Sequence, residues 1–285
     1  MKEQDFIKII QRQTESTYLG DDCAYLQDLG IVITQDNFLE DVHFRTDWAT
    51  PFQIGYKAVS VNISDVLASG AKPAYISVGL SLPNVNDKFI EELYRGIEFG
   101  AMGAEIIGGD ITGADKIFIS ITAIGKTDAR NISSRKFAFP GYIIISPNCE
   151  FGRSSKGLDE LKNGIKYSEN IKHHLEPVLD CNFSAEIATL VKEQYAMMDT
   201  SDGLADALFQ IAKASEVSIV TPKISGAFGA EDYKLVAAIP EKYLNHFGNY
   251  QILGSVNDYQ GYYLKMGDDI YLDYDELNLY NHFEV

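Results

Sequence analysis

The spacing of apolar and polar positions predicts a chain that mixes helices with strands. In the first half, helices are expected near 6–10, at 51–70 and at 86–103. The strands expected there are 23–27, 31–36, 73–82, 104–110 (ending in a glycine turn) and 116–126. The helix over 51–70 has the clearest ends, because Thr50 can cap it, Pro51 suits its first position and Gly70 suits its end.

A second run of elements begins near Pro140. A strand is predicted at 139–146, helices follow up to about Tyr195, and the short strand 195–199 leads into a helix after Gly203. Further strands are expected at 233–240 and 250–256. We therefore predict an α/β (α+β) fold with two domains, residues 1–139 and 140–285.

Composition narrows the range of partners. The 285 residues carry 41 acidic and 24 basic side chains, a formal charge of −17, and 46% of them are apolar. A chain with this negative charge and no run of Lys or Arg is expected to repel nucleic acids and anionic membranes, so neither is an expected partner. No stretch approaches the roughly 18 apolar residues of a membrane span. Three widely spaced cysteines are typical of free thiols in a reducing compartment, so we expect a cytoplasmic protein.

A set of aspartates stands beside small residues, mostly at the ends of the predicted elements. Its members are Asp21, Asp22, Asp36, Asp65, Asp110, Asp199 and Asp202. Carboxylates at strand ends and loop tips can converge in one cleft, where Mg²⁺ takes oxygen ligands together with phosphate and water. An aspartate beside glycine is more often a turn or cap residue, and Thr200 or Ser201 could cap the next helix. The residues alone leave both interpretations open, although a lone carboxylate at Asp65 in a buried helix would be costly.

Familiar nucleotide-binding and hydrolytic signatures are absent from the sequence. It contains no G-x-x-x-x-G-K-[ST], no G-x-G-x-x-G, no serine-triad signature and no H-E-x-x-H. A nucleotide would therefore have to be held through metal ions and glycine turns.

Six motifs, in this order, carry a family resemblance. They are GDDCAYL (20–26), ITQDNFLEDVHF (33–44), GYKAVSVNISDVLASGAKP (55–73), IIGGDIT (106–112), MMDTSDGL (197–204) and GAEDYKL (229–235). The match runs over nearly the whole chain. The set resembles the thiamine-monophosphate kinase family, in the aminoimidazole-ribonucleotide-synthetase-like superfamily.

The resemblance implies a homodimer in which the N-terminal halves of two copies build a β-barrel. ATP and Mg²⁺ would bind in the cleft against the C-terminal half. Matched to metal-binding positions of the family are Asp22, Thr34, Asp36, Asp65, Asp110, Asp199 and Asp202. Matched to nucleotide positions are Gly109, Asp110, Arg135 and Ser201, and matched to substrate positions are His43 and Glu231.

The implied reaction passes the γ-phosphoryl group of ATP to the phosphate of thiamine monophosphate. The acceptor oxygen is already ionised near neutral pH, so the reaction needs charge neutralisation and in-line placement more than a base. Arg135 and Asp202 are the expected catalytic residues, with Arg135 as the cation on the transferred phosphate. Bound cations would also explain how so acidic a chain holds ATP.

The acceptor side departs from the family pattern. Gly113 stands where the family has arginine, the turn at 146–158 reads SPNCEFGRSSKGL, and the segment between SDGL and GAEDYKL is shortened. The aromatic residue that would stack on the thiamine rings has no clean match, and Tyr274, Tyr280 and Phe283 are candidates. Two alternatives therefore stay open: a related ATP-dependent enzyme with another small acceptor, or a nucleotide-binding homologue without catalysis.

Overall fold

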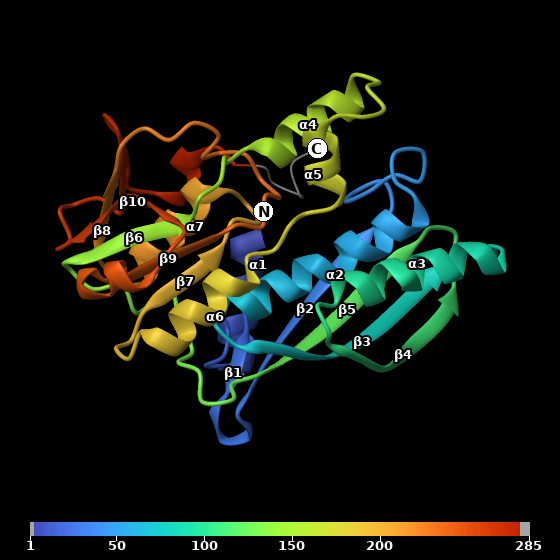
Figure 1. Ribbon diagram of the computed structural model, residues 1–285, viewed down its shortest axis with the longest axis horizontal. Coiled ribbons are helices and arrows are strands. Elements are labelled where there is room, and N and C mark those ends of the chain that lie inside the picture. Colours follow the sequence, from blue (N-terminus) through green and yellow to red (C-terminus); the bar gives the residue numbers. More distant parts are fainter. Residues whose placement is uncertain (1–2, 280–285) are drawn as a thin grey trace.

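A computed structural model describes residues 3–279 and shows two β-sheets with helices packed around them (Figure 1). The first sheet contains β1 (Ala24–Leu26), β2 (Ile31–Leu39), β3 (Lys72–Leu82), β4 (Glu105–Gly113) and β5 (Phe118–Lys126). Its order is β1-β2-β5-β3-β4, and only the β3–β4 pair is parallel. Helices α2 (Pro51–Ala68) and α3 (Asp87–Gly100) lie along one face of this sheet (Figure 1).

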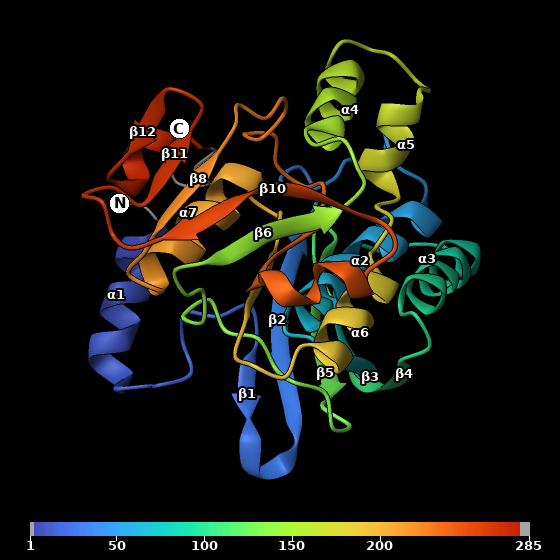
Figure 2. The ribbon, with the colours of Figure 1, turned by 60° about the vertical axis from the view of Figure 1, so that its left-hand side comes forward.

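The second sheet has the order β12-β11-β8-β10-β6-β9-β7. Its strands are β6 (Tyr142–Pro147), β7 (Ala196–Asp199), β8 (Ser218–Thr221), β9 (Leu235–Pro240), β10 (Tyr250–Asn257), β11 (Leu264–Met266) and β12 (Asp269–Tyr271). The helices of this half are α4 (Arg153–Lys162), α5 (Glu169–Leu175), α6 (Cys181–Leu190) and α7 (Leu204–Ala214). Figure 2 shows α7 against the sheet, with α4 and α5 at one end. The predicted α/β (α+β) fold is confirmed.

Helix α2 begins and ends where the sequence predicts. The Thr50 side chain accepts a hydrogen bond from the Gln53 N–H, Pro51 occupies the first turn, and Gly70 follows in a left-handed conformation (φ 85°). Glycines bring α2 and α3 into close contact, because a Cβ at Gly55 or at Gly96 would lie 2.0 Å from a backbone oxygen of the other helix. Most of α2 is buried in this way, so polar groups on it require partners.

Strand β4 is longer than the sequence predicts. Pairing with β3 continues through Gly108 and Gly109 to Gly113, so the expectation that the strand ends in a glycine turn at Asp110 is wrong. The reason is packing: a side chain at Gly109 would lie 1.8 Å from the Val78 carbonyl oxygen, and its absence lets the two strands approach. As the last strand of its sheet, β4 is almost wholly exposed.

The hydrophobic core runs across both halves of the chain. One cluster joins residues of the first sheet and of α2 to residues such as Ile145, Tyr195 and Leu235 of the second half. The two sheets themselves fall on either side of residue 140, and the division into domains 1–139 and 140–285 stays a prediction.

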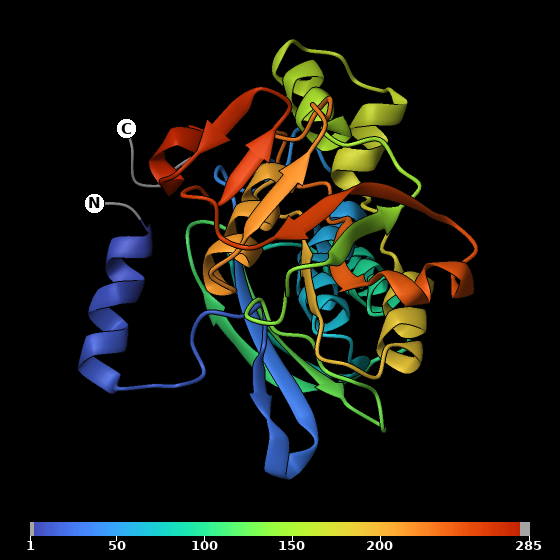
Figure 3. The ribbon, with the colours of Figure 1, turned by 90° about the vertical axis from the view of Figure 1, so that its left-hand side faces the viewer.

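The N-terminal helix α1 (Glu3–Thr14) lies at the outside of the molecule (Figure 3). Its apolar residues Phe6, Ile7, Ile9 and Ile10 are 38–49% exposed. Among residues 3–279 no helix combines the length and apolar character needed to cross a membrane.

Candidate functional site

Three carboxylates from distant parts of the sequence meet where the two halves join. Asp22 precedes β1, Asp65 lies on α2 and Asp199 ends β7. One oxygen of each lies within 4.8 Å of the others, the only such group of metal-binding side chains among the described residues. The structure therefore brings three of the six sequence-predicted carboxylate ligands together.

Two short hydrogen bonds orient these carboxylates. Thr34 on β2 donates its hydroxyl to Asp65 Oδ2 at 2.6 Å, and Ser64 on α2 donates to Asp199 Oδ2 at 2.5 Å. Ser64 and Asp65 are consecutive, so one turn of α2 contributes both a carboxylate and the group that holds another. Sequence reasoning missed Ser64, although it stands inside the motif VNISD.

The electrostatics of this cluster suit a divalent cation. Burial raises the pKa of Asp65 well above its usual range, and the carboxylates of Asp36 and Asp199 raise it further. Burial and the neighbouring Asp22 raise the pKa of Asp199 to about 7. Crowded, buried carboxylates are unstable without positive charge, and hard oxygen donors are the ligands that Mg²⁺ takes. The residues present thus fit Mg²⁺.

Arg135 supplies positive charge beside the cluster. Its Nη2 lies 2.6 Å from Asp22 Oδ1, and both side chains are largely buried. The preceding residue helps to hold this contact, because Asp21 accepts hydrogen bonds from the Ser134 hydroxyl (2.9 Å) and the Arg135 N–H (2.7 Å). Asp21 therefore ties the segment between the halves to the start of β1, a positioning role that the sequence did not reveal.

Strand β2 carries its polar site residues on the buried face. Thr34 and Asp36 alternate with exposed positions and share the face of Val32 and Phe38, which are core residues. The Asp36 N–H donates to Asn62 Oδ1 on α2 at 3.0 Å. An acidic residue in the buried register of a strand is a signal that the sequence pattern already contains.

Gly109 and Asp110 lie away from Asp36, another predicted metal ligand, within one chain. The register aligns Asp36, Ile121, Val78 and Gly109 across β2, β5, β3 and β4. Three strand spacings separate Gly109 from Asp36, about 14 Å. Asp110 occupies the next row and so faces the side of the sheet opposite α2. Its role as a metal ligand stays a prediction.

The loop 200–203 links β7 to α7. Thr200 or Ser201 as the cap of α7 is wrong: Gly203 occupies the N-cap without a side-chain hydrogen bond. The Thr200 hydroxyl instead accepts from the Lys234 N–H (2.9 Å), and the Ser201 N–H donates to Asp199 Oδ1 (3.3 Å). Asp202, in the same loop, is exposed.

The two residues matched to substrate positions, His43 and Glu231, lie near a second cluster of polar and charged side chains. His43 accepts the Leu39 N–H on Nδ1 (3.0 Å), which leaves its Nε2 as the proton-bearing nitrogen of the neutral ring. Glu231 forms an ion pair with the buried Lys57, Nζ to Oε1 3.2 Å, and the ring of His174 lies nearby, Nδ1 to Oε2 3.4 Å. Sequence reasoning singled out neither Lys57 nor His174.

Of the three aromatic candidates, only Tyr274 can be placed. It packs edge-on against Phe209 of α7, with ring centroids 5.9 Å apart, and so belongs to the core of the second half. Tyr280 and Phe283 lie outside the described residues.

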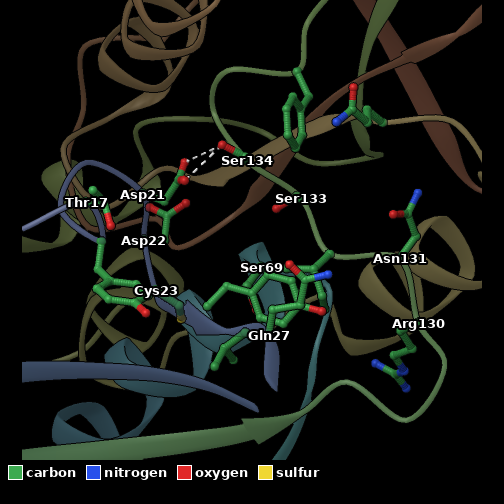
Figure 4. Close-up of a pocket in the computed structure, with 16 residues that line it drawn as sticks. Thr17, Asp21, Asp22, Cys23, Gln27, Ser69, Arg130, Asn131, Ser133 and Ser134 are labelled. Atoms are coloured by element: carbon green, nitrogen blue, oxygen red, sulfur yellow. Dashed lines mark hydrogen bonds between the residues drawn. The ribbon is translucent and has the colours of Figure 1, made fainter. Parts of the chain in front are cut away.

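A cavity of about 570 Å³ reaches the carboxylate cluster at Asp22, which is one of the residues that line it (Figure 4). The segment before β1 and the segment between the halves form its walls. Asp21 and Asp22 stand at one side, with Arg130 and Asn131 at the other. The cavity is therefore polar where it meets the cluster.

Comparisons with known proteins agree with this architecture. A family model described as AIR synthase related protein, N-terminal domain, matches residues 20–127. The thiamine-monophosphate kinase of Bacillus subtilis (strain 168) is 30% identical over 263 residues, which cover 81% of this chain and 80% of the relative. The thiamine-monophosphate kinase of Aquifex aeolicus (strain VF5) is 28% identical over 293 residues, covering 92% and 94%.

Solved structures are similar over nearly the full length. AaThiL complexed with AMPPCP and TMP matches with a TM-score of 0.88 at 27% identity, covering 99% of this chain and 97% of that one. Thiamine monophosphate kinase from Aquifex aeolicus matches with a TM-score of 0.82 at 26% identity, covering 95% and 99%.

Proposed function

Because the chain belongs to the thiamine-monophosphate kinase family, we propose that it transfers the γ-phosphoryl group of ATP to thiamine monophosphate, giving thiamine diphosphate and ADP. The observation that carries the proposal is the convergence of Asp22, Asp65 and Asp199 in one buried group. AaThiL, a protein of similar structure, was solved in complex with AMPPCP, which is an ATP analogue, and TMP. ATP and a phosphorylated small molecule are therefore the proposed ligands.

Asp22, Asp65 and Asp199 would hold Mg²⁺, with Thr34, Asp36 and Asp202 as further candidates. Bound Mg²⁺ supplies positive charge that neutralises phosphate oxygens. Arg135, fixed by Asp22, would place its guanidinium on the transferred phosphoryl group, where negative charge builds up in the transition state. The Ser201 loop, which Asp199 anchors, would present polar groups to the nucleotide phosphates.

Positioning replaces acid–base chemistry in this site. The attacking oxygen of a phosphate monoester is already ionised near pH 7, so the chain has to align it with the γ-phosphorus rather than deprotonate it. Helix α2 provides the alignment, because it contacts strands of both sheets. Asn62 and Asp65 accept hydrogen bonds from Asp36 and Thr34 of β2, and Ser64 donates to Asp199 of β7.

The proposed active form is a homodimer. Strand β4 exposes its free edge, and Ile107 and Ile111 on it are 55% and 66% exposed. An exposed edge strand with large apolar side chains favours pairing with another strand. Gly109 and Asp110 could then serve the nucleotide site of a second copy, which accounts for their distance from Asp36 in one chain.

The test is mass-spectrometric detection of thiamine diphosphate after incubation of the purified protein with Mg²⁺, ATP and thiamine monophosphate. An Asp199→Asn variant is the control, since it preserves shape but removes a carboxylate. Product formed by the wild type and lost in the variant supports the proposal. If the wild type binds Mg-ATP but forms no thiamine diphosphate, the acceptor is wrong, and other small phosphates should be tried.

A further inference from the structure

Lys57 is a buried cation that the proposed mechanism does not use. It lies on α2, is 2% exposed, and forms an ion pair with Glu231 on the loop before β9. A lysine ammonium is rarely buried without a reason, because desolvation is costly and the pair must offset it. Its position therefore requires an explanation.

His174 on α5 completes the cluster as a neutral group. Both of its ring nitrogens lie 3.5 Å from Lys57 Nζ, and its Nδ1 lies 2.9 Å from the Ser154 hydroxyl. Burial and the adjacent Lys57 lower the pKa of His174 to about 3. The cluster thus holds one positive charge, on Lys57, and one negative charge, on Glu231.

Glu231 is held from several sides yet stays accessible. Its backbone is left-handed (φ 64°), which is unfavourable for a residue with a side chain, and its N–H donates to the Ser201 carbonyl oxygen at 2.6 Å. Lys57 and His174 contact one carboxylate oxygen each, while 25% of the side chain remains exposed. A ligand can therefore reach a carboxylate whose orientation is already fixed.

The position of Lys57 along α2 fixes how far this cluster lies from the carboxylate cluster. Lys57 and Asp65 are eight residues apart on one straight helix, about 12 Å along its axis. Asp65 belongs to the carboxylate cluster, where the phosphates are proposed to bind. His43, Lys57, His174 and Trp48 line one small cavity at the other end. The Lys57 end of α2 and the carboxylate cluster are therefore about 12 Å apart along the helix.

We infer that Lys57 is a positioning residue that, with His174, fixes the Glu231 carboxylate to accept an N–H from the amino-substituted heterocycle of the acceptor. This inference rests on the proposed function, because it assigns the heterocycle end of the acceptor to this cluster. The competing explanation is purely structural: Lys57 joins α2 to the second half and does not influence ligand binding.

The experiment compares Lys57→Met with a matched control, Lys234→Met, which removes another buried lysine, paired with Asp180 at 3.4 Å. Steady-state kinetics would be measured against thiamine monophosphate and against ATP. For Lys57→Met we expect the KM for thiamine monophosphate to rise about tenfold or more while the KM for ATP stays within about twofold. Lys234→Met should leave the ratio of the two KM values unchanged.

The double variant Lys57→Met/Glu231→Gln separates positioning from folding. Removing both charges should restore the melting temperature that Lys57→Met loses, because no buried charge remains unpaired. The acceptor KM should stay high in the double variant, since the fixed carboxylate is gone. If the acceptor KM recovers together with the melting temperature, Lys57 is structural and the inference is overturned.

The failure of this inference is distinguishable from failure of the proposed function. An active wild type whose Lys57→Met variant keeps its acceptor KM overturns the inference alone. A wild type that neither binds nor phosphorylates thiamine monophosphate overturns both.

Discussion

Ser64 on α2 donates a 2.5 Å hydrogen bond to Asp199 at the end of β7, across 135 residues of sequence. This contact joins the two halves of the chain at the carboxylate cluster. Since α2 also contributes Asp65, the position of that helix decides whether the carboxylates converge.

The Ser64→Ala variant should bind Mg-ATP about tenfold or more weakly, because loss of a group that orients a metal ligand typically costs that much. Isothermal titration calorimetry with Mg²⁺ and a non-hydrolysable ATP analogue measures the effect. The matched control is Ser60→Ala, a buried serine one turn earlier whose hydroxyl lies close to Gly100 of α3. Equal losses in the two variants would show that Ser64 acts through helix packing alone.

The Asp199→Asn and Asp36→Asn variants should weaken Mg²⁺-dependent ATP binding and leave the fold intact. Asp199→Asn removes charge from a crowded, buried group, so without metal it should melt at a higher temperature than the wild type, by roughly 2–4 °C for each kcal/mol of repulsion relieved. Adding Mg²⁺ should stabilise the wild type more than the variant. Thermal melts in chelator and in Mg²⁺ test this, and an undiminished Mg²⁺ response would remove that residue from the metal site.

The Arg135→Lys variant should lose kcat by about 10²-fold or more, since an ammonium cannot reproduce the guanidinium contact with both Asp22 and a phosphoryl group. The affinity for Mg-ATP should change much less than kcat. Lys136→Met, at the exposed neighbouring position, is the control. Single-turnover kinetics measure the phosphoryl-transfer step directly; an unchanged rate would contradict the catalytic assignment.

His174 makes stability depend on pH. Its pKa is lowered to about 3 by burial and Lys57, against about 6.5 in the unfolded chain, so the unfolded state binds the extra proton between these values. This contribution is fully present above pH 6.5 and is lost as pH falls toward 3, by up to about 1.4 kcal/mol per pH unit. Urea unfolding at pH 5.0 to 6.5 should show a shallower pH dependence for His174→Gln than for the wild type. His246→Gln, at an exposed site, is the control.

The Gly109→Ala variant should detach β4 from β3, because the added methyl group would lie 1.8 Å from the Val78 carbonyl oxygen. We expect a lower melting temperature and, if β4 mediates dimerisation, a weaker dimer by analytical ultracentrifugation. Gly113→Ala meets no atom within 4 Å and serves as the control on the same strand. A stable, fully dimeric Gly109→Ala protein would contradict both expectations.

Local features of the fold could be predicted from the sequence because their causes are local. The cap at Thr50 and the proline at position 51 fix the start of α2, and alternating side chains identify β2 and β5. The length of β4 could not be predicted, since it depends on a close approach between Gly109 and Val78 of another strand.

For the site, the sequence alone determined which residue types were available and that their order resembles one kinase family. It could not show which aspartates meet, because Asp22, Asp65 and Asp199 converge only when α2 packs between the two halves. It also gave no reason to single out Lys57 and His174, whose significance comes from burial and from their contacts with Glu231. Pairwise distances between remote segments are set by the packing of the core, and that information exists only in the tertiary structure.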